Sequence, residues 1–191
     1  MSDALKHALT AEHMSVEAYL TGESFRQHRH EYMYGSVYAM AGASRNHNII
    51  THNLHRVFGN ALLDKDCLVL GSDMKLKLND EVFYYPDVML GCEAEGHELY
   101  IERPCLIVEV LSRSTERHDR FEKAINYQLL PSLEAFLLVD SQSRAITIYR
   151  KSVQGWHLER CDSSEDGVLE LPCGIGHIRP SDIYYKTPFA F

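Results

Sequence analysis

Two acidic residues lie in apolar segments where a carboxylate is costly to bury. Glu109 lies inside residues 106–111, whose other members are all apolar, and Asp87 follows Pro86 within the apolar segment 82–90. Burying an unpaired carboxylate costs several kcal/mol, roughly, so such a group is normally paired, protonated or bound to a metal ion. A bend at Pro86 would re-aim Asp87, because proline in a strand is confined to its start or to a bulge.

The two acids together favour a metal site. Two carboxylates from neighbouring strands can chelate one Mg²⁺ or Mn²⁺, since these cations prefer oxygen ligands. The acids repel each other when no cation is present, and a metal-bound water can attack a phosphodiester. The structural alternative is an ion pair of Glu109 with Arg103 or Arg113, and for Asp87 a turn after proline.

The order of these acids resembles the signature of a nuclease superfamily. Pro86-Asp87 followed by Glu109-Val110-Leu111 resembles the PD-(D/E)xK motif, and the closer similarity is to the Uma-two-type endonuclease family within it. The short motif has little specificity, whereas the ordered set of segments has much more. The similarity runs from about residue 14 to residue 140, and its other segments are Glu31-Tyr32, residues 35–44, His47, Ser72-Asp73-Met74-Lys75, Ser112 with Ser114-Thr115, and Asp119 with Lys123 and Tyr127.

This resemblance implies a fold and an activity. The fold is an α/β (α+β), restriction-endonuclease-like core, in which a central mixed β-sheet is flanked by helices and preceded by an N-terminal hairpin and helix. The implied activity is Mg²⁺-dependent hydrolysis of DNA, with metal ligation by Asp87, Glu109 and the carbonyl of Val110. The alternative is a catalytically inactive module of the same fold that binds DNA or protein.

One position departs from the superfamily pattern, which has lysine two residues after Glu109. Leu111 occupies that position, and leucine cannot orient or deprotonate water. We predict that a lysine from another element serves the site. Lys123, four residues after Asp119 on a predicted helix, is the first candidate, and Lys75 is the second.

The helix predicted after residue 115 has an apolar face that does not include Lys123. That face consists of Phe121, Ala124, Ile125, Gln128 and Leu129, all but Gln128 apolar or small. Lys123 lies nearly opposite, on the side of Tyr127 and Leu130, so it serves the site only if this second face points at the acids. The alternative is a solvated lysine paired with Asp119.

Secondary site candidates are Glu31, His47 and Asp73. Glu31 could supply the acid that many such nucleases bring from an N-terminal element, and His47 could contact phosphate or Asp73. A structural hydrogen-bonding role is the alternative for each. Basic residues near the acids could form a phosphate-facing patch or a solvated helix start; they are Arg113, Arg117, His118 and Arg120.

Periodicity and turn signals predict the elements that position these residues. Strands are predicted over residues 68–70, 74–78, 82–90, 106–111 and 135–140, and hairpins over 31–40 and 145–160. Helices are predicted over 15–22 and 47–63, with Ser15 and Ser44 as N-caps, and after a cap within 112–115. The strand, helix and strand between 106 and 140 form a βαβ unit, which is normally parallel.

The 191 residues suit a single domain over 1–191, with a peripheral segment 1–30 and a loop-rich tail 162–191 that ends in exposed aromatic residues. No apolar run is long enough to span a membrane, and no secretory signal is visible. These features predict a cytoplasmic protein that has no membrane partner. The net charge of -8 argues against non-specific coating of nucleic acid but permits a nuclease with a local positive groove. Double-strand cleavage by a single-site nuclease needs two copies or two visits, so a homodimer is one expectation.

Five cysteines are present, an odd number without a CxxC pair. This pattern favours a reduced compartment and no disulfide framework, and the spacings argue against a four-cysteine zinc site. The histidine pairs His28/His30 and His52/His55 fix no third zinc ligand.

Overall fold

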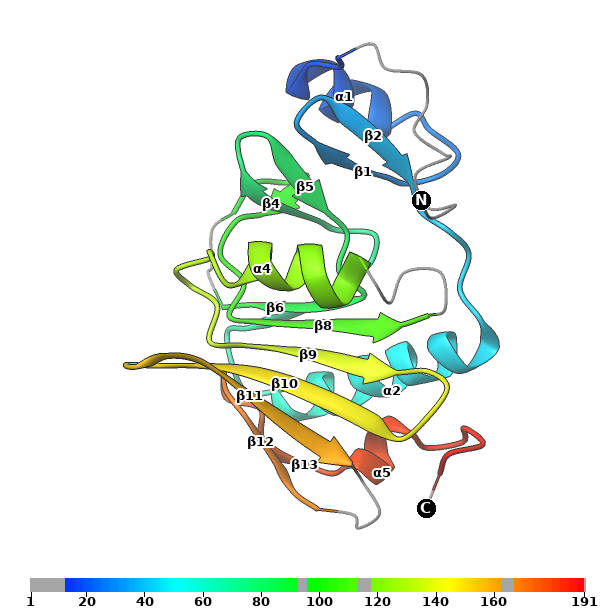
Figure 1. Ribbon diagram of the computed structural model, residues 1–191, viewed down its shortest axis with the longest axis vertical. Coiled ribbons are helices and arrows are strands. Elements are labelled where there is room, and N and C mark those ends of the chain that lie inside the picture. Colours follow the sequence, from blue (N-terminus) through cyan, green and yellow to red (C-terminus); the bar gives the residue numbers. More distant parts are fainter. Residues whose placement is uncertain (1–12, 93–95, 113–117, 163–166, 191) are drawn as a thin grey trace.

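The structure is a computed structural model that describes residues 13–92, 96–112, 118–162 and 167–190. Its strands form two mixed sheets, each with one parallel pair of strands, and one separate antiparallel hairpin (Figure 1). The five-stranded sheet has the order β2-β1-β5-β4-β7, and the six-stranded sheet has the order β11-β10-β9-β8-β6-β3. The architecture is therefore the mixed α+β fold that the sequence predicts.

The strands of the five-stranded sheet are β1 (His30–Met33), β2 (Ser36–Ala39), β4 (Lys75–Asn79), β5 (Val82–Tyr84) and β7 (Tyr100–Ile101). Those of the six-stranded sheet are β3 (Leu68–Gly71), β6 (Val88–Gly91), β8 (Leu106–Leu111), β9 (Ala135–Asp140), β10 (Ala145–Ser152) and β11 (Gly155–Asp162). The separate hairpin pairs β12 (Leu169–Leu171) with β13 (Gly176–Ile178).

The helical elements are α1 (Val16–Glu23), α2 (Arg45–Ala61), the π-helical turn η2 (Asp119–Lys123), α4 (Ala124–Tyr127) and α5 (Pro180–Ile183). Both predicted N-caps are confirmed, because the hydroxyl of Ser15 accepts from the N–H of Ala18 and that of Ser44 from the N–H of His47. The predicted βαβ unit is also confirmed, since β8 precedes η2 and α4 in the chain, β9 follows them, and the two strands pair in parallel.

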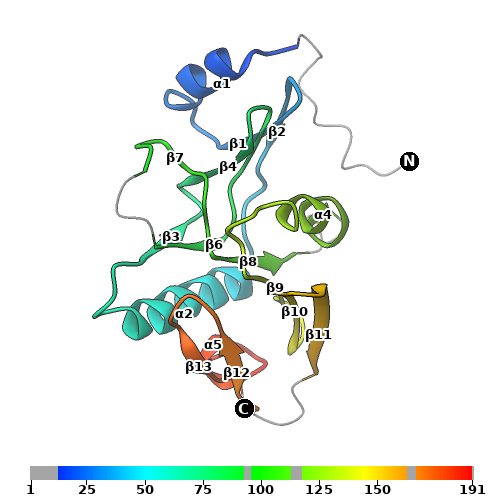
Figure 2. The same ribbon diagram turned by 90° about the vertical axis from the view of Figure 1, so that its left-hand side faces the viewer.

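The six-stranded sheet is covered on both faces (Figure 2). Alternate residues of a strand point to opposite faces. On one face, strand residues such as Val108 and Leu137 pack against α2 and the chain after β11. On the other face, residues such as Ile107 and Phe136 pack against Tyr127 of α4 and against the five-stranded sheet. Both faces are therefore buried, as a central parallel pair requires.

The segment predicted as one strand with an interruption at 86–87 divides between the two sheets. β5 pairs with β4 and β1 in one sheet, whereas β6 pairs with β3 and β8 in the other. The connector 85–87 therefore carries the chain from sheet to sheet and ends at Asp87, directly before β6.

The face of the helix after residue 118 differs from the sequence prediction. Phe121, Ile125 and Leu129 are 65, 65 and 69% exposed, whereas Lys123 and Tyr127 are buried. The predicted apolar face is wrong because the tyrosine and the charged side chains find partners in the interior. The proposed cap at Ser114 and Thr115 lies outside the described residues.

The C-terminal region contains more structure than the predicted loop-rich tail. Strands β12 and β13 and helix α5 form there, and Ile183 and Tyr184 are fully buried. Phe189 is partly buried against the apolar cluster around α2, which corrects its predicted exposure. None of the described helices is long and apolar enough to span a membrane.

The cysteines also correct a sequence prediction. Two disulfides join Cys67 with Cys92 and Cys105 with Cys173. The sequence spacing gave no hint of this pairing, because the four residues lie at strand ends and in a turn that only the folded sheet brings together.

Candidate active site

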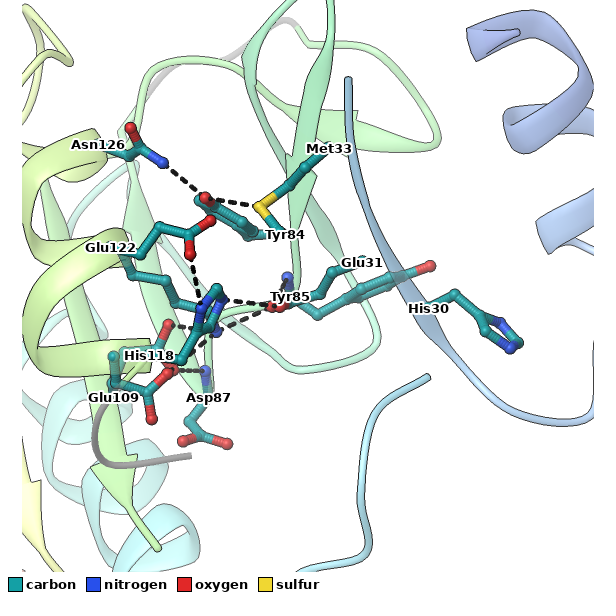
Figure 3. A network of polar contacts seen from close by, with 12 residues as sticks. His30, Glu31, Met33, Tyr84, Tyr85, Asp87, Glu109, His118, Glu122 and Asn126 are labelled. Carbon is teal, nitrogen blue, oxygen red and sulfur yellow. Dashed lines mark hydrogen bonds and ion pairs between the residues drawn. The ribbon is translucent and has the colours of Figure 1, made fainter. Parts of the chain in front are cut away.

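The two predicted acids meet where β6 and β8 lie side by side (Figure 3). Val88 pairs with Val108 in the antiparallel ladder, so Asp87 and Glu109 come next to each other. The N–H of Val110 donates to Asp87 Oδ2 at 2.8 Å, and the N–H of Asp87 contacts Glu109 Oε2 at 3.4 Å. The spatial convergence on which the sequence interpretation depended is therefore present.

Glu109 points toward the helix that follows β8. Strand alternation places its side chain on the same face as Ile107 and Leu111, which pack with Tyr127. Its Oε1 accepts hydrogen bonds from the Tyr127 hydroxyl at 2.5 Å and from Lys123 Nζ at 3.1 Å. The partner of Glu109 is thus a lysine of the next helical segment.

Lys123 is the centre of a three-carboxylate cluster. Besides Glu109, its Nζ lies 2.8 Å from Glu31 Oε1 and 3.4 Å from Asp119 Oδ1. The lysine side chain is only 7% exposed, so these ion pairs form in a site with little water. The structure therefore brings Lys123 and Glu31 to Asp87 and Glu109, although Lys123 lies in the helical turn η2 and Glu31 lies in strand β1 of the five-stranded sheet.

The helical segment presents its buried polar residues through a π-helical turn. Asp119, Lys123 and Tyr127 recur every four residues, and all three are buried. Such single π turns often occur at functional sites, because the wider turn re-aims side chains. The sequence offered Asp119 as a partner of Lys123 and placed Tyr127 on the same side of the helix, but the contact of Tyr127 with Glu109 was not predicted.

Two histidines extend the network. His47, in the first turn of α2, places Nε2 3.2 Å from Asp87 Oδ2, so it contacts Asp87 and not Asp73. His118 lies between Glu31 Oε2, at 3.6 Å, and a carboxylate oxygen of Glu122, at 3.2 Å (Figure 3). His118 is thus engaged with two acids, whereas Arg113 and Arg117 of the predicted basic patch lie outside the described residues.

The structure keeps Asp73 and Lys75 away from this cluster. The side chain of Asp73 is 86% exposed and forms an ion pair with Arg29. Lys75 Nζ lies 5.5 Å from the centre of the Tyr85 ring, in the five-stranded sheet. Of the two candidate lysines, Lys123 alone contacts Glu109.

Burial and charge shift the pKa values of these groups in opposite directions. Burial raises the pKa of Glu109 to about 8; Lys123 opposes this rise, and the charges of Asp119 and Asp87 add to it. Burial would also raise the pKa of Glu31, but Lys123 and His118 lower it to about 2. Burial disfavours charged Lys123, yet Glu109 and Glu31 hold its pKa well above the usual range.

His47 responds to its carboxylate partner. Burial lowers the pKa of His47, but the hydrogen bond and charge of Asp87 outweigh burial and raise it above the usual histidine value. A protonated His47 would hold Asp87 as a carboxylate in a fixed orientation. That is the state in which Asp87 could bind a cation.

Asp87 and Glu109 are the residues of this arrangement that could hold a divalent cation. Asp87 Oδ1 has no partner among the described residues, and Glu109 Oε2 has only the 3.4 Å contact. Among these residues no three His, Cys, Asp or Glu side chains form a ready metal site. Mg²⁺ is commonly held by one or two carboxylates with several waters, so two acids suffice.

The chain is similar to one protein family and to two related proteins. A profile of the Uma2 family, described as "Putative restriction endonuclease", matches residues 16–176. The uncharacterized protein slr1290 of Synechocystis sp. is 38% identical over 177 residues, which cover 91% of this chain and 92% of that protein. The uncharacterized protein sll1609 of the same organism is 32% identical over 147 residues, covering 74% of this chain and 83% of its own length.

A solved structure has the same fold. It is described as a putative nuclease belonging to DUF820 from Anabaena variabilis, and it superposes with a TM-score of 0.70 at 15% identity. The superposition covers 83% of this chain and 91% of the other. The predicted nuclease-like fold is therefore confirmed.

Proposed function

Because the chain belongs to the Uma2 family of putative restriction endonucleases, we propose that it is a Mg²⁺- or Mn²⁺-dependent endonuclease that hydrolyses DNA. The observation that carries this proposal is the meeting of Asp87 and Glu109, with Lys123 on Glu109. Nuclease folds host other functions, so the proposal depends on this site and not on the fold alone.

In the proposed reaction, Asp87 and Glu109 would hold the divalent cation, because each keeps a carboxylate oxygen with few protein contacts, Oδ1 of Asp87 and Oε2 of Glu109. The bound cation would supply a water of lowered pKa and offset negative charge on the phosphate. The contact observed from Val110 is its N–H to Asp87, and carbonyl ligation by Val110 remains part of the proposal. Ionisation of Glu109, opposed by burial, becomes favourable beside a cation.

Lys123 would act as a cation and hydrogen-bond donor. Its raised pKa keeps it protonated near neutral pH, so it does not abstract a proton from water. Held by Glu31, Glu109 and Asp119, its ammonium group is fixed close to the metal ligands. This fixed charge can orient the attacking water or stabilise the charge that develops on the phosphate, which replaces the lysine missing at Leu111.

The alternative is a module that binds DNA or protein without cutting. The observation that favours it is the contact of Lys123 with three acidic side chains, which is also typical of a purely structural polar cluster. The negative charge of such an acidic cluster repels a phosphate group unless a bound cation offsets it. DNA cleavage assays with controlled metal content distinguish the two proposals.

The test uses supercoiled plasmid, the full-length protein, and Mg²⁺, Mn²⁺ or a chelator. We expect nicked or linear plasmid with either cation and intact plasmid with chelator. Asp87→Asn and Glu109→Gln should each lower the rate by about 100-fold or more, as expected for loss of a metal ligand or charge stabiliser. Asp73→Asn is the matched control, because Asp73 is exposed and outside the site.

Cutting that survives in the chelator, or falls equally in Asp73→Asn, would contradict the proposal. Retardation of DNA on a gel without cutting, with or without metal, would establish the binding module instead. Circular dichroism of each variant ensures that lost activity does not come from lost structure.

We further propose that DNA is cut by a homodimer in the cytoplasm. A single active site cuts one strand at a time, so two copies related by a twofold axis would cut both. Light scattering on the purified chain, with and without a DNA duplex, would give the mass of one or two chains.

A further inference from the structure

Four cysteines from four separate segments converge at the end of the six-stranded sheet that lies opposite Asp87. Cys67 precedes β3, Cys92 follows β6, Cys105 precedes β8, and Cys173 lies in the turn between β12 and β13. The N–H of Cys105 donates to the carbonyl of Leu90 at 2.8 Å, which holds the ends of β6 and β8 together. Disulfides join Cys67 to Cys92 and Cys105 to Cys173.

The two disulfides are themselves in contact. Cys92 Sγ and Cys105 Sγ, which belong to different disulfides, lie 3.7 Å apart, so all four sulfurs form one group. Zinc binds thiolates tetrahedrally at about 2.3 Å, which places neighbouring sulfurs about 3.8 Å from each other. The contact between the disulfides therefore has the spacing of two thiolates on one zinc ion.

The spacings in the sequence argue against a four-cysteine zinc site, but the folded chain brings the four sulfurs together. We propose that Cys67, Cys92, Cys105 and Cys173 bind one zinc ion as four thiolates when both disulfides are reduced. In the disulfide form the described residues hold no group of three or more such ligands, so the metal site requires reduction first. A four-thiolate site with no open position is of the structural kind and leaves no place for substrate.

The chemistry balances with a dithiol as reductant. Two dithiol molecules become two cyclic disulfides and deliver four electrons and four protons to the four protein sulfurs. Zinc then replaces the four thiol protons, which pass to water, and the complex carries a net charge of minus two. No other oxidant or reductant is needed.

The surroundings suit an anionic metal complex. The ammonium of Lys65 donates to the carbonyl of Gly174, next to Cys173, and Lys65 also lies two residues before Cys67. Its charge would offset part of the negative charge of four thiolates. Cys67, Cys105 and Cys173 are partly buried against the apolar cluster around α2, which limits access of water to these three residues, whereas Cys92 is exposed.

The turn that carries Cys173 has an uncommon backbone conformation. Cys173 has φ +58° and Gly174 has φ +77°, both in the left-handed region. A non-glycine residue there is uncommon and is maintained only when its surroundings require it. Here the Cys173 sulfur is bonded to that of Cys105 at the sheet end.

The test uses the full-length chain, reduced with a dithiol, freed of reductant without air, and titrated with Co²⁺ as a spectroscopic probe. We expect one Co²⁺ per chain to give thiolate-to-cobalt charge transfer and the strong visible absorption of tetrahedral cobalt, signals that a cation on Asp87 and Glu109 would not give because that site has no sulfur ligand. One equivalent of Zn²⁺ should bleach that absorption. Cys161→Ser should keep the spectrum, because Cys161 is outside the group, whereas Cys92→Ser and Cys173→Ser should lose it.

Two outcomes would overturn the proposal: no tetrahedral cobalt spectrum in the reduced wild-type chain, or equal loss in Cys161→Ser. The wild-type measurement needs no substitution, so a misfolded variant cannot hide the answer. Glu109→Gln should retain the cobalt spectrum, because the sulfur group lies at the other end of the sheet. The proposal therefore stands or falls independently of nuclease activity.

Discussion

Strands β6 and β8 have a different chemistry at each end. At one end Asp87 and Glu109, 22 residues apart, meet beneath the helix that carries Lys123. At the other end Cys92 and Cys105, 13 residues apart, bring two disulfides into contact. The same antiparallel pair thus builds a polar, charged site and a sulfur group.

The comparison shows two ways in which a sheet creates a site. Glu109 depends on strand alternation, since only one face of β8 looks toward Lys123 and Tyr127. The cysteines depend on which strand ends are neighbours and on where the β12–β13 hairpin packs. A change at the carboxylate end should therefore lower activity, whereas a change at the sulfur end should lower stability and leave activity in place.

The largest effect on stability is expected from the sulfur end under oxidising conditions. The disulfide between Cys105 and Cys173 has a sequence separation of 68, and that between Cys67 and Cys92 a separation of 25. Chain entropy predicts that replacing both cysteines of a pair by serine lowers the free energy of unfolding by about 4.4 kcal/mol for the longer loop and about 3.5 for the shorter.

Denaturant unfolding monitored by circular dichroism measures these losses, with Cys161→Ser as control. Plasmid cleavage should survive in both double variants at a temperature where they remain folded. Loss of cleavage in a fully folded double variant would contradict the separation of the two ends.

The next effect concerns the lysine at the carboxylate end. Lys123→Met should lower the rate of plasmid cleavage by about 100-fold or more, the typical result of removing one preorganised charge donor. Lys75→Met, which removes the other candidate lysine, should leave the rate nearly unchanged. If the two rates are reversed, the assignment of Lys123 is wrong.

A smaller effect should appear in the pH dependence of stability. The pKa of Glu31 is about 2 in the folded state and 4.5 ordinarily. Between these values the unfolded chain binds a proton that the folded chain lacks, so stability from Glu31 is complete above pH 4.5 and is lost as pH falls toward 2. The slope is at most about 1.4 kcal/mol per pH unit.

The measurement is the difference in unfolding free energy between wild type and Glu31→Gln at several pH values. The advantage of the wild type should shrink as the solution is acidified below the ordinary glutamate pKa. A difference that stays constant with pH would show that the Lys123–Glu31 ion pair does not stabilise the fold.

The smallest effect is expected at the start of α2, where Ser44 caps the helix that carries His47. Ser44→Ala should lower the free energy of unfolding by about 1 kcal/mol through the lost cap. Ser15→Ala removes the equivalent bond at α1 and should cost a similar amount. Only Ser44→Ala should also slow cleavage, since His47 contacts Asp87; equal rates would argue against a positioning role for His47.

Much of the carboxylate end could be predicted from the sequence. A glutamate inside an apolar strand and an aspartate after proline are conspicuous, because burying them needs an explanation. Lys123 was also a candidate, because the family resemblance calls for a lysine that Leu111 does not supply, and the structure places it on Glu109. The orientation of its helix was not, because Phe121 and Ile125 imitate a buried face while Tyr127 and Lys123 form the true one.

The sulfur end could not be predicted for a different reason. Cysteine is often buried as a small apolar side chain, so a cysteine at a strand end looks ordinary. Cys173 lies 68 residues from Cys105, and only the docking of the β12–β13 hairpin brings it near. The order of strands in the sheet, which local pattern does not encode, decides such contacts.

The central claim is that Asp87 and Glu109 together hold one divalent cation. Titration of the full-length chain with Mn²⁺, followed by electron paramagnetic resonance of the free ion, counts the sites directly. We predict one Mn²⁺ bound per wild-type chain, lost in Glu109→Gln and Asp87→Asn and kept in Asp73→Asn. Equal Mn²⁺ binding by wild type and both site variants would contradict the account.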